Sequence, residues 1–239
     1  MTASRALSIA IVLHVFLLVY WLGGDLGTYY SSRYVMKREV GLEARSIALK
    51  IMSFCDVFPR ICLVLFLPSG ITLMGLNNLG RDQFGGWRLI PVWIFGFAWL
   101  SLVIYEYRSH GVGKHITLIR NADLIIRYLL IVGLLIASSV VLVIGDPFGV
   151  QTNPRWLAGK VMLYAIAILM GVLIRRELKP FGAAWVALVR SGKSPGSDEI
   201  ESGIGGAIER SEKYVYLIWV CVIGAAILGI VKPGIMNYS

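Results

Sequence analysis

Apolar residues gather in six long runs along the chain, and short polar segments separate these runs. The runs cover residues 6–23, 51–76, 89–105, 124–145, 156–174 and 214–231. A helix needs about 20 apolar residues to cross about 30 Å of hydrocarbon, and it satisfies its backbone polar groups internally. The pattern therefore predicts an all-α fold, a polytopic transmembrane helix bundle with about six spans.

The composition favours the same class of protein. Hydrophobic residues make up 57% of the 239 residues, more than in an average soluble domain, and the mean hydropathy is +0.73. The first run is not followed by a small-x-small cleavage site, so we expect it to be a permanent helix. We thus predict a single integral membrane domain over residues 1–239, with the lipid bilayer as its partner.

Lys and Arg residues are divided unevenly between the two sets of connecting segments. Fifteen of them lie in the segments after the first, third and fifth runs, and five lie on the opposite side. Positive residues favour cytoplasmic loops, so we expect both termini outside, in a bacterial-type inner (plasma) membrane. The net charge of +9 calls for no nucleic-acid partner, because these loops hold most of it.

Residues 175–213 form the longest predicted cytoplasmic loop. Its stretch "RSGKSPGSDEIESGIGGAIER" is rich in Gly and Ser, which predicts a mobile segment and then a short helix leading into the last span. The "GIGGA" within it lacks the strand and the spacing of a phosphate-binding loop, so we assign no nucleotide site. Cys55, Cys62 and Cys221 form no CxxC pair, and we expect them to pack as small hydrophobic side chains.

A histidine interrupts the first apolar run, in "LHVFLLVYWLGGDLGTYY". Trp21 follows His14 by seven residues and Asp25 follows Trp21 by four, so the three lie near one helical face. Gly23 and Gly24 would let another helix or a flat ligand approach the backbone. Two interpretations of His14 stay open, a cofactor ligand and a hydrogen-bond donor to a neighbouring helix. Trp21 either belongs to this site or anchors the helix at the membrane interface.

Lys160, in the fifth run, is expected at the depth of His14. With both termini outside, each residue lies roughly six to eight positions in from the outer end of its helix, which matches their depths within about a turn. We predict that the two side chains face one another across an internal cavity. A neutral Lys160 would serve as a ligand or in proton transfer; a lysine that snorkels to the outer surface is the alternative. His110 and His115 lie in a basic connecting segment and are expected to be solvated.

A second polar layer is expected nearer the cytoplasm. Asp56 and Arg60 are four residues apart, which favours an ion pair within one helix, with a proton relay as the alternative. Arg127 enters the fourth span from the same side, and with Asp25 these residues would form a charged cap beneath His14 and Lys160. Arginines in such a place bind carboxylates, including those of a porphyrin.

Two stretches resemble a known membrane protein family. "HVFLLVYWLGG" resembles the first-helix signature of the HemJ and CopD-like membrane proteins, a histidine followed seven residues later by Trp and then by small residues. "RWLAGKVMLYAIAILMGVLIRR" resembles the later HemJ-type segment, and Trp156 and Lys160 fall on its two marked positions. "LKIMSFCDVFPRICLVLFLPSGITLM" is loosely similar to the family's second helix, so the resemblance covers about a third of the chain.

The resemblance implies a haem-b-binding membrane oxidoreductase or electron-transfer protein, similar to the HemJ-type oxidases of protoporphyrinogen IX. The family's histidine corresponds to His14, as metal ligand and catalytic residue, and its lysine corresponds to Lys160, also catalytic. The expected cofactor-binding residues are His14, Lys160, Trp21, Gly24, Arg60 and Arg127. Whether the chain is an enzyme that acts on a porphyrinogen stays open.

Two other classes of function stay open as well. A CopD-like transporter or copper-handling protein would need several outward Met, His or Cys ligands, because soft donors select copper. The outward segments hold few of these beyond Met1 and Met236. A non-catalytic subunit of a larger membrane complex, or a homo-oligomer, would use the seven Trp and eleven Tyr as lipid and partner surface.

Overall fold

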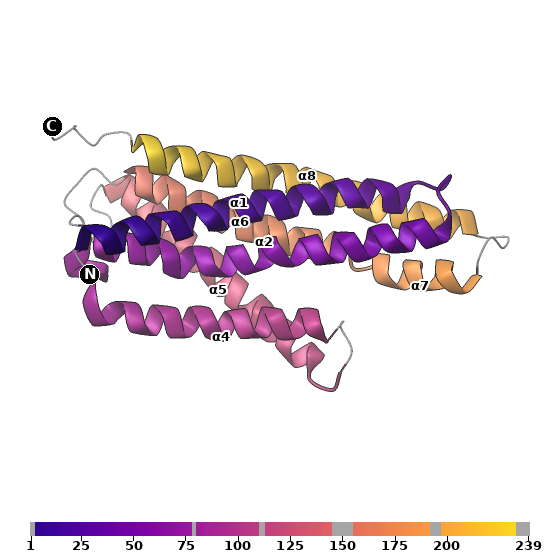
Figure 1. The fold of residues 1–239 in the computed structure, drawn as a ribbon, viewed down its shortest axis with the longest axis horizontal. Coiled ribbons are helices and arrows are strands. Elements are labelled where there is room, and N and C mark those ends of the chain that lie inside the picture. Colours follow the sequence, from indigo (N-terminus) through magenta and orange to yellow (C-terminus); the bar gives the residue numbers. More distant parts are fainter. Residues whose placement is uncertain (1–2, 78–79, 110–112, 145–154, 192–196, 233–239) are drawn as a thin grey trace.

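The computed structural model describes residues 3–77, 80–109, 113–144, 155–191 and 197–232, and these residues form an all-α architecture (Figure 1). The helices are α1 (Ala3–Met36), α2 (Leu42–Leu76), α3 (Arg81–Phe84), the 3₁₀ turn η1 (Gly86–Arg88), α4 (Leu89–Arg108), α5 (Ile116–Ile144), α6 (Arg155–Glu177), α7 (Phe181–Ser191) and α8 (Ser197–Val231). The predicted fold class is confirmed.

Six stretches of these helices are long and apolar enough to cross a membrane. They are Arg5–Met36, Leu42–Leu76, Gly86–Arg108, Ile116–Ile144, Arg155–Arg190 and Asp198–Val231. Each contains one of the six predicted apolar runs or nearly all of it. The chain is therefore a multi-pass membrane protein, as the hydropathy pattern predicted.

Successive long helices run in opposite directions, so the first residues of α1 and the last residues of α8 lie at the same end of the bundle (Figure 1). We call this the terminal end. We call the other one the basic end, because α1, α4 and α6 finish there with arginines in their last turns: Arg33, Arg108, Arg175 and Arg176. The basic end corresponds to the predicted cytoplasmic side.

α1, α2 and α8 each continue nine residues or more beyond their predicted apolar runs at the basic end. α1 extends to Met36, α2 begins at Leu42 and α8 begins at Ser197, whereas the runs stop at residue 23 and start at residues 51 and 214. With 35 residues, α2 is about 52 Å long, which exceeds the roughly 30 Å of a hydrocarbon core. Hydropathy marks only the part of a helix that suits lipid, so the polar extensions of α1 and α2 were not predicted.

The extensions pack together with α7 around a small second core, which we call the basic-end bundle. Its buried residues are Val35, Ala48, Leu188, Ile204 and Ile208, from α1, α2, α7 and α8. Residues 181–191 and 197–213 of the predicted loop are thus helical. The helix expected before the last span is the beginning of α8.

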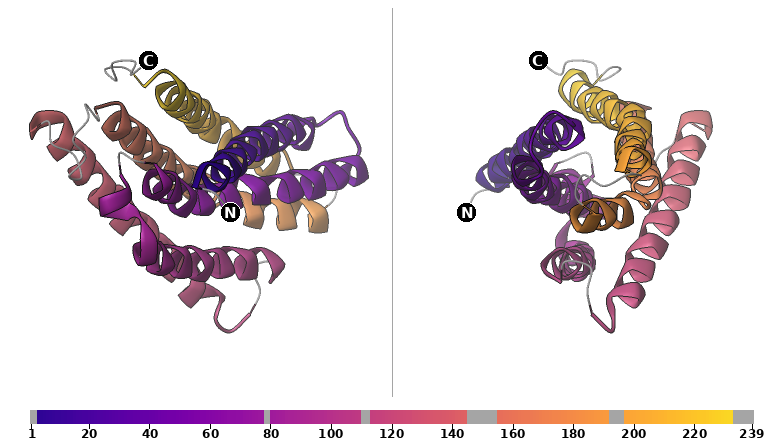
Figure 2. Two further views of the ribbon diagram at one scale, coloured as in Figure 1. Left: turned by 60° about the vertical axis from the view of Figure 1, so that its left-hand side comes forward. Right: turned by 90° about the vertical axis from the view of Figure 1, so that its right-hand side faces the viewer.

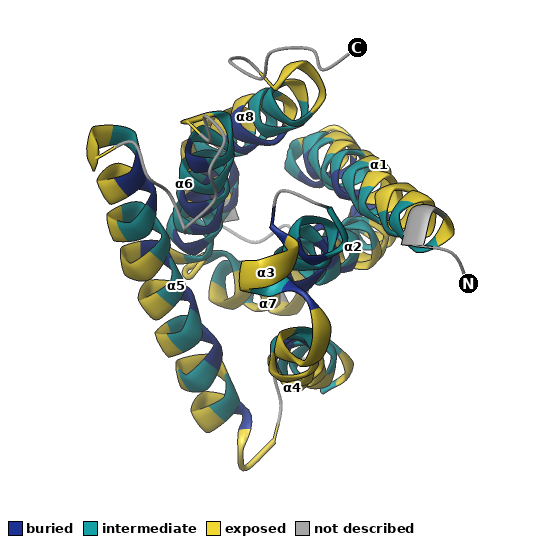
Figure 3. Cartoon of the chain, turned by 90° about the vertical axis from the view of Figure 1, so that its left-hand side faces the viewer, coloured by how far each residue is buried: buried dark blue, intermediate teal, exposed yellow. Residues whose placement is uncertain are grey.

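The main core lies between the spans. It buries Trp21 of α1, Val64 of α2, Trp99 of α4 and Ile168 of α6, together with residues of α5 and α8. Cys62 and Cys221 are buried and free, as expected for cysteines that pack as hydrophobic side chains. The outward sides of α1, α4 and α5 expose apolar residues (Figure 3), which suits contact with lipid tails.

α4 packs mainly against α2, and the two helices are antiparallel. Trp93 Nε1 donates a hydrogen bond to Thr72 Oγ1 at 2.9 Å, and a Cβ on Gly96 would lie 3.0 Å from Pro68 Cγ. α5 diverges from α4 toward the terminal end, so the two helices approach one another only near the basic end (Figure 2). Polar residues of α2, α4, α5 and α6 lie close together near the basic end, where α4 and α5 come close to one another.

Candidate functional site

His14 lies between α1 and α2, in the half of the bundle nearer the terminal end. Its Nδ1 is 2.9 Å from the Oγ of Ser69, which is buried. The imidazole meets the ring of Phe66 edge-on, with 4.6 Å between the ring centroids. His14 Nε2 is enclosed by protein atoms and has no hydrogen-bond partner among the described residues.

The hydrogen bonds of Ser69 determine which nitrogen of His14 carries the proton. Ser69 Oγ is also 3.2 Å from the carbonyl oxygen of Phe66, to which only the hydroxyl can donate. A hydroxyl has one proton, so both contacts are hydrogen bonds only if Ser69 donates to Phe66 and accepts from Nδ1–H of His14. The neutral imidazole then has an unshared electron pair on Nε2.

Trp21 and Gly24, two of the predicted cofactor-binding residues, pack inside the helix bundle. Trp21 is buried and contacts Phe66 edge-on, at 5.3 Å between ring centroids, so it is a core residue and not an interface anchor. A Cβ on Gly24 would lie 2.6 Å from Pro59 Cδ. The close approach that this glycine predicted is therefore made by another helix, α2.

Lys160 lies on α6 and packs against α8. Its Nζ is 2.8 Å from the place that a Cβ of Gly229 would take. The charge of Lys160 acts on His14, which puts both residues in the same region of the bundle. No hydrogen bond or ion pair joins them in the described part of the chain, and their predicted arrangement across a cavity stays a prediction.

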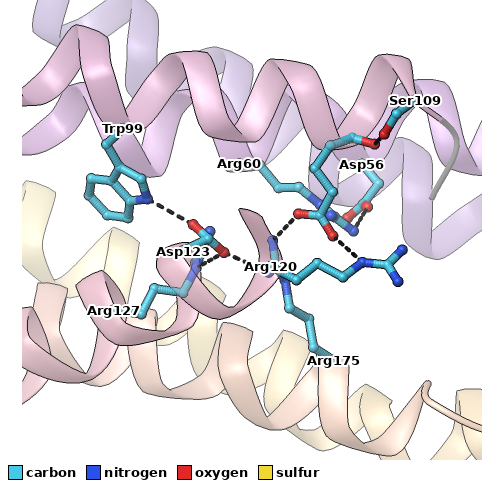
Figure 4. A network of polar contacts seen from close by, with 9 residues as sticks. Asp56, Arg60, Trp99, Ser109, Arg120, Asp123, Arg127 and Arg175 are labelled. Atoms are coloured by element: carbon cyan, nitrogen blue, oxygen red, sulfur yellow. Dashed lines mark hydrogen bonds and ion pairs between the residues drawn. The ribbon is translucent and has the colours of Figure 1, made fainter. Parts of the chain in front are cut away.

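The predicted second layer is a larger charged network near the basic end (Figure 4). Its members come from four helices, α2, α4, α5 and α6: Asp56, Arg60, Trp99, Glu106, Arg120, Asp123, Arg127 and Arg175. We call these eight residues the charged network. The predicted ion pair between Asp56 and Arg60 is confirmed.

Asp123 is the centre of the charged network, and its side chain is only 1% exposed. One carboxylate oxygen accepts a hydrogen bond from Trp99 Nε1 at 2.8 Å. The other accepts from Arg127 Nε at 2.9 Å and from Arg175 Nη1 at 2.6 Å. Asp123 therefore ties α4, α5 and α6 together at one point.

Glu106 extends the charged network to the surface. It accepts a hydrogen bond from Arg120 Nε at 3.0 Å, and its other oxygen lies 3.6 Å from Arg175 Nη2. Arg60 and Arg127, the predicted binders of porphyrin carboxylates, are thus both occupied by carboxylates of the protein, Asp56 and Asp123. Asp25 does not join them in a charged cap, because it forms no ion pair within the described ranges.

Sequence reasoning overlooked Asp123 and Ser69. Asp123 carries the same signal as Asp56, a carboxylate four residues before an arginine, but it fell just outside the run that was predicted to begin at residue 124. Ser69 gave no signal, because a serine in an apolar run usually bonds to its own helix. Only the packing of α1 on α2 brings it to His14.

Among the residues that the structure describes, no group of three or more His, Cys, Asp or Glu side chains could hold a metal ion. His115 lies at the start of α5 and is exposed, while His110 falls outside the described residues. Within the described part, His14 is thus the histidine placed in the interior of the bundle. A metal at this place would need a group that brings most of its own ligands, as a porphyrin does.

Comparison of the chain with protein-family models, with curated proteins and with solved structures found no match. The resemblance to the HemJ and CopD-like proteins therefore stays a prediction from the sequence.

Proposed function

We propose that this multi-pass membrane protein binds haem b through His14 and works as an oxidoreductase or electron-transfer protein of the HemJ type. The proposal includes its location, a bacterial-type plasma membrane with the basic end in the cytoplasm. The hydrogen-bond arrangement of His14 carries the proposal, and the resemblance of the two segments agrees with it.

A histidine that ligates a metal usually donates a hydrogen bond from its second nitrogen to a fixed partner. The contact of His14 Nδ1 with Ser69 supplies this partner and leaves the electron pair of Nε2 free. A histidine that served only to join two helices would leave no nitrogen unsatisfied in the interior, because a buried polar atom without a partner costs about 1–3 kcal/mol. The orphaned Nε2 therefore favours a ligand over a purely structural role.

The neighbours of His14 suit a flat apolar macrocycle only in part. Phe66 and Trp21 give an aromatic wall that excludes water. The full enclosure of Nε2 means that side chains beside it must move aside when a porphyrin binds. In this proposal Lys160, whose charge acts on His14, serves as a second ligand or as a proton donor. Haem would supply one-electron chemistry in this dry interior, while the chain orients the ligand nitrogen and keeps water out.

The test is the visible absorption spectrum of the full-length protein, purified in detergent after expression with ample haem. We expect a strong Soret band in the wild type and in His115→Ala, which removes an exposed histidine. His14→Gly should lose the band, and added imidazole should restore it by filling the space of the missing ring. A wild type without a Soret band, or a band that persists unchanged in His14→Gly, would overturn the proposal.

A further inference from the structure

Asp25 is an acidic residue at membrane depth that has no cationic partner among the described residues. The other carboxylates that lie near the spans' interior, Asp56, Glu106 and Asp123, each pair with an arginine. Asp25 forms no ion pair in the described ranges, and its Oδ2 is buried without a hydrogen-bond partner there. It lies in α1 eleven residues after His14, about 16 Å closer to the basic end and on nearly the same helical face.

The groups around Asp25 come from α1, α2 and α8. The indoles of Trp21 and Trp219 lie beside its carboxyl group, from α1 and α8. The titratable group that acts on it is Asp56 of α2, and the charge of Asp25 acts in turn on Cys62, also of α2. Close packing of α1 on α2 encloses the site, since a Cβ on Gly24 would already meet Cys55 O at 3.0 Å. None of these neighbours offers a positive charge.

A carboxylate with a buried oxygen that has no partner in the described part of the chain is unstable as an anion in such a place. Removing an ion from water costs several kcal/mol, and here no cation repays that cost. The acidic group that acts on it, Asp56, forms an ion pair with Arg60, so a second negative charge beside it would add repulsion. Of the two carboxyl groups, Asp25 is the one without a cation beside it among the described residues, so the neutral, protonated form is favoured there.

We propose that Asp25 is a proton-binding site inside the membrane and that it exchanges its proton with the basic end by way of Asp56. The carboxylate of Asp25 takes a proton from hydronium, leaving water, and gives it back to water; no electrons move. Asp56 is suited to pass the proton to the basic end, because its side chain is 37% exposed and it belongs to the charged network. This site does not depend on haem, so a protein without a Soret band would leave it standing.

Infrared spectroscopy of the full-length protein in lipid vesicles tests the site directly. A protonated carboxyl group absorbs apart from a carboxylate, and labelling of aspartate with ¹³C at its side-chain carboxyl carbon shifts its band. Near neutral pH we expect one buried, protonated aspartate band in the labelled wild type, and we expect it to disappear as the pH is raised. The band should be absent in Asp25→Asn and present in Asp198→Asn, the matched control at a side chain that is 98% exposed.

A second variant of Asp25 and a pH-jump measurement complete the test. If Asp25→Asn fails to fold, Asp25→Glu replaces it, and the band should then no longer shift with labelled aspartate. In Asp56→Asn the band should respond to a pH jump more slowly than in the wild type, since the group that passes the proton on is gone. No protonated aspartate band in the folded wild type, a band that survives in Asp25→Asn, or a band that follows sodium concentration and not pH would each overturn the proposal.

Discussion

Gly24 of α1 lies directly against Pro59 of α2, and a Cβ on Gly24 would come within 2.6 Å of Pro59 Cδ. Pro59 lies inside α2 and has no N–H, so the carbonyl of Cys55 one turn earlier receives no helical hydrogen bond from it. That carbonyl also faces Gly24, at 3.0 Å from the same Cβ position. Gly96 and Pro68 repeat the arrangement between α4 and α2. Each of the two prolines inside α2 thus packs against a glycine of a neighbouring helix.

Gly24→Ala is expected to destabilise the protein by about 1–3 kcal/mol, because the added methyl group overpacks the contact of α1 with α2. The free energy of unfolding in mixed detergent micelles measures the change. Gly23→Ala is the matched control, since nothing lies within 4 Å of a Cβ at Gly23. The control should be neutral or more stable by up to about 1 kcal/mol, because alanine favours the helix. Equal effects of both substitutions would contradict the close packing at Gly24.

Asp123→Asn should cost about 3–5 kcal/mol, because it leaves the buried Arg127 and the partly buried Arg175 without their shared carboxylate. The new amide side chain would also place N–H donors where Asp123 accepts hydrogen bonds from Arg127 and Arg175 or from Trp99. Asp198→Asn removes the same charge from a side chain that is 98% exposed and paired to Arg38 at 3.5 Å. We expect that control to change the free energy of unfolding by less than about 0.5 kcal/mol. Similar losses for both variants would show that Asp123 is not the centre of the charged network.

Local patterns account for the parts of the molecule that were predicted well. Apolar runs define the spans because lipid imposes the same requirement on each helix separately. The pair of Asp56 and Arg60 followed from their spacing alone, since both side chains belong to one helix. In the same way, the placement of Cys62 and Cys221 in the core follows from their apolar surroundings.

Contacts between helices account for what was missed. Asp123 meets Trp99 and Arg175 only because α4, α5 and α6 converge near the basic end, and no spacing in the sequence encodes that convergence. Ser69 reaches His14 across 55 residues of sequence. The carboxylates expected for Arg60 and Arg127 do exist, but they belong to the protein itself. Pairing across helices depends on their rotation and crossing, which hydropathy does not determine.

The basic-end bundle provides a third prediction. Arg45 of α2 and Glu201 of α8 form two hydrogen bonds, at 2.6 and 2.7 Å, and the Arg45 side chain is 3% exposed. A double-mutant cycle with Arg45→Met and Glu201→Gln should give a coupling free energy of about 1–3 kcal/mol. The same cycle on the exposed pair of Arg38 and Asp198 should give less than about 0.5 kcal/mol. Equal coupling in the two cycles would contradict a buried pair that joins α2 to α8.

The last prediction concerns the part of α2 that extends beyond the membrane at the basic end. α4 has 20 residues, which fits a hydrocarbon core of about 30 Å, and it runs beside α2 with Gly96 against Pro68. In an antiparallel pair, Arg108 at the end of α4 is then level with Asp56 on α2. Ile47 lies nine residues farther on, about 13 Å beyond the end of α4.

Ile47→Cys should therefore react with a water-soluble maleimide, whereas Val132→Cys, in the middle of α5, should not. The two positions are matched, because their side chains are exposed to the same degree, 53% and 56%, and both are apolar and β-branched. Only the surroundings differ, water and headgroups for Ile47 and lipid tails for Val132. The wild-type protein gives the background labelling of the three native cysteines. In vesicles of known orientation, Ile47→Cys should be labelled only from the cytoplasmic side. Labelling of Ile47→Cys from the outside would mean that the protein has the opposite orientation. Labelling of Val132→Cys would contradict the placement of α5 in lipid.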